Sequence, residues 1–296
     1  MGKMIKKKPV LLGLFCVFFL ATAYLYGQRP GIGDGNRDFF GEVLEAMQRA
    51  FDRAESQPTL EDAYFLGRAV AAHILALYPP YTQNPELTRY LNKICQALVI
   101  NSPRPTAFRG YFVVILDSHE FNAFASPGGH IFLTRGLVEA AMSEDMLAAV
   151  IAHELAHIML DHGLSMIDEM AFLDEAAAIA GRAAAFASDR PVAERLMGFR
   201  SSVSAIVETL VRTGYSREQE FAADRKAVEL LVAAGYNPRA LVDMLRILQQ
   251  RQGSHADGLL ATHPPPAERI RNVEEAIRRH RVADTSAHRR ARFANR

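Results

Sequence analysis

The sequence predicts an α+β fold that is mostly helical, with one small sheet embedded among the helices. Three observations carry this prediction. Apolar residues recur at helical spacing along most of the chain. Stretches rich in β-branched and aromatic residues are confined to residues 111–134. No segment repeats with a period of 20–50 residues, which excludes a solenoid.

The composition excludes several classes of protein. A chain of 296 residues with 49% hydrophobic residues is large enough to bury a sizeable core. A net charge of +1 argues against a protein that coats nucleic acid. Two cysteines are too few for a disulfide framework or an all-cysteine zinc site. Only one segment is apolar enough to cross a membrane, so a multi-span transporter is excluded.

That apolar segment predicts export. Four lysines lie within the first eight residues, and no charge occurs from Pro9 to Tyr26. Small residues at Ala21 and Ala23 favour a signal peptide over residues 1–23, cut after Ala23. The segment is also just long enough to remain as a membrane anchor, so both readings stay open. Either way we expect an exported protein, in the periplasm or anchored and facing it.

The first elements follow a linker. Residues 24–37 are rich in glycine, and folded structure is expected from Asp38 onward. Helical spacing predicts three helices, Phe39–Ala54, Leu60–Tyr78 and Glu86–Ile100. The sequence then becomes rich in aromatic and β-branched residues. Three strands are expected, at Tyr111–Leu116, Phe121–Ala125 and His130–Thr134. The turn at residues 126–129 separates the last two strands.

The rest of the chain is expected to be helical. The predicted helices are Met142–His162, Ser165–Ala187, Val192–Arg212, Arg217–Ala234, Pro238–Gln250 and Pro266–Arg279. The apolar helices between Met159 and Val211 are expected to pack in the core, with a lid or contact with a membrane surface as alternatives. The basic tail, residues 278–296, is expected to be disordered and solvated, with contact to anionic lipid or a partner as the alternative.

The most informative segment is the helix expected to start at Ser143. It presents His153, Glu154 and His157 in the order HExxH. Residues four apart share one helix face, so the two imidazoles can grip one Zn²⁺. Glu154 is offset from that pair and can take a proton from a water and return it to a leaving amine.

A second helix offers further ligands. Glu220 and Asp224 are four apart on one face, so Glu220 can complete a set of two histidines and one glutamate. Asp224 can hold the other nitrogen of a ligating histidine. A metzincin would need a histidine at position 163, which is Gly163. We therefore exclude that class and read His162 as a histidine at the helix end, near the C-terminal dipole.

At this point the chain resembles the M48 zinc metallopeptidases, a gluzincin family. The family includes CAAX-processing prenyl proteases, HtpX, the mitochondrial Oma type and the BepA and LoiP type. The matching motifs are Asn122–Gly129, Thr134–Leu137, Ser143–Asp145, His153–His157, Ser216–Asp224, Gly235–Pro238 and Thr262–Pro264. The layout is closest to the soluble BepA and LoiP type, without its TPR repeats. The resemblance runs from about Leu60 to Ile277, and we expect the peptidase domain to span residues 38–277.

The resemblance also implies roles for individual residues. His153, His157 and Glu220 would hold one Zn²⁺ per chain, with Glu154 as general base and Asp224 behind a ligating histidine. It further implies that Asn122, Ala123 and Phe124 lie on the edge strand of the cleft, where free N–H and C=O groups pair with an extended substrate. From the residues alone, Asn122 can equally be a turn residue and Phe124 a core residue.

His263 lies in the Thr262–Pro264 segment and keeps three readings. It can be a fourth metal ligand that closes the site, a group that stabilises the transition state, or a plain loop residue. The first reading predicts a latent enzyme.

Together these observations predict a zinc-dependent endopeptidase of the cell envelope. The resemblance suggests unfolded or misassembled envelope proteins as substrates, in protein quality control, and contact with a membrane surface stays open; nucleic acid is not expected. The alternative is a zinc-bound chaperone or assembly factor with little proteolysis, which the intact Glu154 disfavours. A membrane-anchored scaffold without zinc is a third hypothesis.

Overall fold

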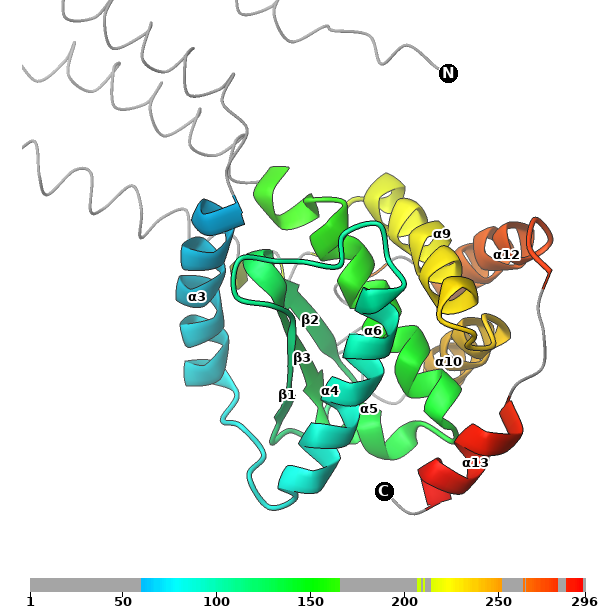
Figure 1. The fold of residues 1–296 in the computed structure, drawn as a ribbon, viewed down its shortest axis with the longest axis horizontal. Coiled ribbons are helices and arrows are strands. Elements are labelled where there is room, and N and C mark those ends of the chain that lie inside the picture. Colours follow the sequence, from blue (N-terminus) through cyan, green and yellow to red (C-terminus); the bar gives the residue numbers. More distant parts are fainter. Residues whose placement is uncertain are drawn as a thin grey trace, which may run out of the picture. The chain divides into compact units, whose positions relative to one another are not determined.

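A computed structural model describes residues 60–165, 207, 208, 210, 214–251, 263, 265–281 and 286–294 (Figure 1). The expected leader, the linker and the helix Phe39–Ala54 lie outside the described residues. The helices Ser165–Ala187 and Val192–Arg212 also lie almost entirely outside them. Within the described part of the chain, none of the helices combines the length and apolarity needed to cross a membrane.

A three-stranded mixed sheet forms the β part of the fold. Its strands are β1 (Phe112–Leu116), β2 (Ala123–Ser126) and β3 (His130–Thr134), in the order β1-β3-β2. β1 runs parallel to β3, and β2 runs antiparallel to it, so that Phe124 lies opposite Phe132. The three predicted strands are confirmed to within two residues. β2 pairs with β3 alone among the described strands and forms an edge of the sheet.

Eight helices of the described residues have defined bounds, as follows: α3 (Leu60–Leu77), α4 (Pro85–Ile100), α5 (Arg135–Ala140), α6 (Glu144–Met159), α9 (Arg217–Ala233), α10 (Arg239–Gln250), α12 (Pro266–Ile277) and α13 (Ser286–Ala294). Six of them match predicted helices. The short α5 was not predicted, because six residues are too few to show a helical period. It begins where the Thr134 hydroxyl accepts a hydrogen bond from the Leu137 N–H.

The sheet separates two apolar clusters. On one face, Val113, Ile115 and Leu133 join the main core, which α4, α6, α9 and α10 also supply. On the other face, Phe124 and Phe132 pack against α3. This alternation follows from the two-residue period of a strand. The fold is thus α+β and mostly helical, as predicted.

Helix α6 lies at the centre of this arrangement. Every one of its residues is buried. It packs against β2, α4, α9 and α10, and Figure 1 shows α9, α10 and α12 on the side away from α3. The Ser143 hydroxyl caps its first turn by accepting from the Met146 N–H at 3.2 Å. A helix buried on all sides holds its side chains in fixed positions, which suits a site that needs precise geometry.

The structure of residues 286–294 differs from the expected disordered tail. Residues 286–294, predicted to be disordered, form helix α13 and pack against α6. The composition suggested a solvated end because arginines dominate it. The structure shows that two of these arginines, Arg289 and Arg292, pair with the carboxylates of Asp145 and Glu144. Charge density along the sequence could not reveal those partners.

Candidate metal centre

The centre begins with the two histidines of α6. Because His153 and His157 are one turn apart, their rings lie on the same helix face, with Nε2 atoms 3.1 Å apart. Both residues are buried. Burial lowers the pKa of His157 to about 3, so this imidazole is neutral and has a lone pair to offer.

Glu220 reaches the same point from α9. A capping box between Ser216 and Gln219 begins this helix and places Glu220 in its first turn. Its Oε2 lies 3.5 Å from His153 Nε2, and its Oε1 lies 3.4 Å from His157 Nε2. Burial alone would raise the pKa of Glu220, but His263 and Arg269 hold it well below its ordinary value.

These three distances fit a metal ion. Ligand atoms about 2.0–2.1 Å from a tetrahedral Zn²⁺ lie roughly 3.3–3.4 Å from one another. The observed separations of 3.1, 3.4 and 3.5 Å are close to that value, and they involve both carboxylate oxygens of Glu220, one toward each histidine. In addition, Glu220 Oε1 is buried and has no hydrogen-bond partner among the described residues. A buried carboxylate oxygen without a partner is costly, and a cation would satisfy it.

His263 joins this group as a fourth member. Its Nδ1 lies 2.6 Å from Glu220 Oε2, and its side chain is 5% exposed. One ligand atom from each of His153, His157, Glu220 and His263 lies within 4.8 Å of the others. The structure therefore places His263 at the centre itself. The set has three histidines and one carboxylate, a combination that zinc accepts.

Asp224 lies behind His153, one turn beyond Glu220 on α9. Its Oδ1 is 3.1 Å from His153 Nδ1, the nitrogen that faces away from the candidate ion. Burial and Arg269 both act to lower the pKa of His153, but hydrogen bonds to Asp224 and Glu220 raise it to about 9. A carboxylate behind a ligating histidine fixes both its orientation and its tautomer.

Arg269 was missed by the sequence analysis. It donates from Nε and Nη2 to Asp224, at 3.0 and 2.6 Å, and its Nη2 also lies 3.2 Å from His153 Nε2. The residue is 2% exposed. A signal was available, because Arg269 precedes Val273 and Ala276 at four and seven residues on the buried face of α12. A charge at a core position marks a site to be explained.

His157 has its own supporting contacts. His162 Nδ1 lies 3.0 Å from His157 Nδ1, and the Tyr215 ring stacks on the imidazole with centroids 4.1 Å apart. His162 does follow the end of α6, as expected. However, the left-handed conformation of Asp161 turns the chain back, so His162 contacts His157 rather than only the helix end. No sequence pattern pointed to Tyr215, which precedes the Ser216 cap of α9.

Glu154 lies beside the group without joining it. It is 2% exposed, and burial raises the pKa of its carboxyl to about 7. It lines a small cavity together with His153, His263 and Arg269. The remaining lining is apolar and consists of Phe121, Val150, Leu241, Met244, Leu245 and Leu248. A carboxyl group in such surroundings can exchange a proton near neutral pH.

The expected substrate strand is β2 with the residue before it. Asn122, Ala123 and Phe124 are each at most 2% exposed. The Asn122 side chain accepts from the Ala123 N–H at 2.9 Å, and Phe124 packs in the cluster against α3. Strand β2 is at the sheet edge and packs beside α6.

Comparison with known proteins supports the same interpretation. The family model described as peptidase family M48 matches residues 83–277. The chain is 27% identical over 212 residues to the beta-barrel assembly-enhancing protease of Yersinia pestis, covering 70% of this chain and 43% of that protein. It is 28% identical over 188 residues to metalloprotease YcaL of Escherichia coli (63% and 68%). It is 27% identical over 198 residues to metalloprotease LoiP of the same organism (66% and 72%).

The matched region contains every residue of the centre described above. The chain spans about two fifths of the length of the assembly-enhancing proteases that it matches. The family model nevertheless covers about two thirds of this chain, including both α6 and α9. We conclude that the chain belongs to peptidase family M48.

Proposed function

We propose that this protein is a zinc-dependent metalloendopeptidase of the cell envelope. One observation carries the proposal. His153 Nε2, His157 Nε2 and the carboxylate of Glu220 converge within 3.1–3.5 Å of one another, as zinc ligands do, and a buried carboxyl, Glu154, lies beside them. The names of the relatives, all proteases, support the reaction class.

In this proposal Glu154 performs the proton transfers. Zinc, when bound, would act as a Lewis acid and make an attacking water more acidic. Glu154 takes the proton from that water and later donates it to the nitrogen of the leaving amine. A carboxyl whose pKa burial has raised toward neutrality can perform both transfers. Arg269 and Asp224 hold His153 in place throughout.

His263 would control access to the centre. Its Nδ1 lies 2.6 Å from Glu220 Oε2, close enough to take a coordination position that a substrate or water would otherwise use. We propose that the described state is closed, with His263 as a fourth ligand, and that its withdrawal opens a coordination position. The edge strand at Asn122–Phe124 would then pair with an extended substrate, which requires the Ala123 N–H to leave its hydrogen bond with the Asn122 side chain.

The envelope location and the substrate class rest on sequence. The lysine-rich leader with its uncharged stretch supports export. Relatives named for beta-barrel assembly support unfolded or misassembled envelope proteins as substrates. A chaperone that used the same cleft without cleavage would not need Glu154 at this position, so we favour the peptidase.

Metal removal and return test this proposal. Full-length protein stripped with a chelator should lose cleavage of casein, an unfolded substrate. One equivalent of Zn²⁺ should restore cleavage, and Mg²⁺ should not, because nitrogen ligands select zinc. If the stripped protein cleaved casein as fast as the untreated protein, a zinc-dependent mechanism would be excluded.

A further inference from the structure

Two neighbouring carboxylates lie buried in the first turn of α6. The side chains of Glu144 and Asp145 are 1% and 9% exposed. Buried carboxylates lose their hydration, and two adjacent ones also repel each other. Such a pair is stable only if the surrounding groups supply hydrogen bonds and positive charge. The proposed peptidase reaction does not use either residue.

Neutral groups satisfy part of this demand. The hydroxyls of Tyr90 and Tyr236 donate to Glu144, at 2.8 and 3.1 Å. The backbone N–H of Asn237 donates to Asp145 at 2.8 Å. We call the group formed by Tyr90, Glu144, Asp145 and residues 235–237 the α6 socket. These contacts leave the two negative charges of the socket without a counter-charge.

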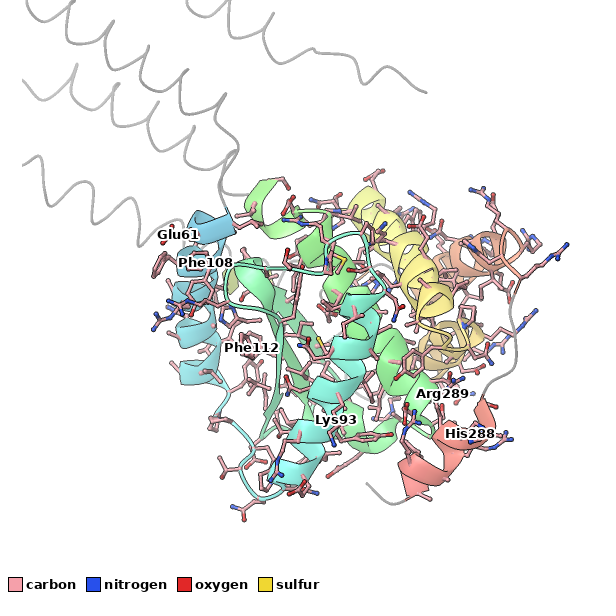
Figure 2. All side chains as sticks on the ribbon, in the orientation of Figure 1. Glu61, Lys93, Phe108, Phe112, His288 and Arg289 are labelled. Carbon is pink, nitrogen blue, oxygen red and sulfur yellow. The ribbon has the colours of Figure 1, made fainter. Side chains whose placement is uncertain are left out.

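Helix α13 supplies that counter-charge. Arg292 pairs with both oxygens of Glu144. Arg289 pairs with both oxygens of Asp145, and these two distances are 3.0 and 2.9 Å. Arg289 also donates to the Gly235 carbonyl at 3.0 Å, and its guanidinium lies 5.0 Å from the centre of the Tyr236 ring. Figure 2 labels Arg289 on α13, on the side next to the body of the molecule.

We propose that the α6 socket is a docking site for an Arg-x-x-Arg helix and that its occupant is the chain's own C-terminal helix. Arginines three residues apart share one helix face, which lets both forks reach adjacent carboxylates. In this way α13 binds the first turn of α6, the helix that carries His153, Glu154 and His157. The inference goes beyond the proposed peptidase activity and does not depend on the metal.

Because Arg289 and Arg292 bind these carboxylates, they are not available to bind a lipid surface. Moving Arg289 to a membrane would leave Asp145 buried without its counter-charge, which would strongly destabilise the folded protein. Arg290, next in the chain, is exposed and belongs to the opposite face of α13. The two neighbours therefore provide a matched pair of residues, one docked and one solvated.

The test compares Arg289→Gln with Arg290→Gln in the full-length protein. Arg289→Gln should lower the thermal midpoint of unfolding by roughly 6 °C or more, because the buried carboxylate of Asp145 loses its counter-charge. Arg290→Gln should change the midpoint by less than about 2 °C. Hydrogen exchange in the first turn of α6 should speed up in the first variant alone. Equal effects of the two variants would overturn the proposal.

Two further measurements keep the test decisive. Asp145→Asn combined with Arg289→Gln should be less destabilising than the sum of the two single variants, since both remove the same pair. Strict additivity would overturn the docking. If Arg289→Gln does not fold, Arg292→Gln replaces it, because that side chain is 55% exposed. Equal loss of binding to phosphatidylglycerol vesicles by Arg289→Gln and Arg290→Gln, without loss of stability, would assign the helix to lipid instead.

Discussion

At the scale of single residues, the two histidines of α6 have different supports. His153 is held by Asp224 and Arg269, which also bind each other. His157 is held by His162 and the Tyr215 ring. The spacing of the sequence predicted that the ligands would meet, because helical periodicity fixes which residues share a face. It could not predict Arg269 or Tyr215, because their contacts depend on how separate helices pack.

Asp224 provides a direct test of this support. Asp224→Ala should weaken zinc binding about 10- to 100-fold, because His153 loses the group that orients it. Zinc affinity measured by competition with a fluorescent chelator checks this expectation. Glu218→Gln on the same helix is the control, since Glu218 is exposed and should leave affinity unchanged. Equal affinities in all three proteins would contradict the role given to Asp224.

His263 is tested by removal. If it closes the centre, His263→Ala should raise the rate of casein cleavage several-fold at saturating zinc. The reason is that a coordination position becomes free for the substrate or the attacking water. The control is Arg271→Gln, because Arg271 is exposed on the nearby helix α12. An unchanged or lower rate in His263→Ala would argue against a latent enzyme.

At the scale of elements, the turn between β2 and β3 positions the sheet against α3. Gly128 has φ 76°, and a Cβ at this position would lie 2.4 Å from the Tyr64 Cα. The sequence predicted the turn from its Pro-Gly-Gly run. It did not show that the glycine also permits the close approach of another helix, since that contact joins segments more than sixty residues apart.

Substitution at Gly128 should therefore be more harmful than at a glycine of the same conformation. Gly235 also has φ 76°, and a Cβ there would meet nothing within 4 Å. Gly235→Ala should cost about 1 kcal/mol from backbone strain alone. Gly128→Ala should cost at least about 2 kcal/mol more, from the clash with Tyr64. Urea unfolding of both variants measures the difference, and equal costs would show that the contact is unimportant.

At the scale of the whole molecule, the sequence predicted the fold class and the order of the described elements other than α5 and α13. It did so because apolar periodicity, capping residues and turn residues act locally. The expectation of a disordered tail was wrong for residues 286–294, because their stabilising partners are on α6. The net charge of +1 thus includes arginines that are engaged inside the folded unit.

The central claim concerns one residue within this molecule, the base beside the metal centre. The most direct measurement compares the wild-type protein with Glu154→Gln for zinc content and casein cleavage. Glu154 is not a ligand in this account, so the variant should keep one zinc per chain and lose cleavage by at least about 100-fold. A variant that kept its zinc and cleaved casein at the wild-type rate would contradict the account.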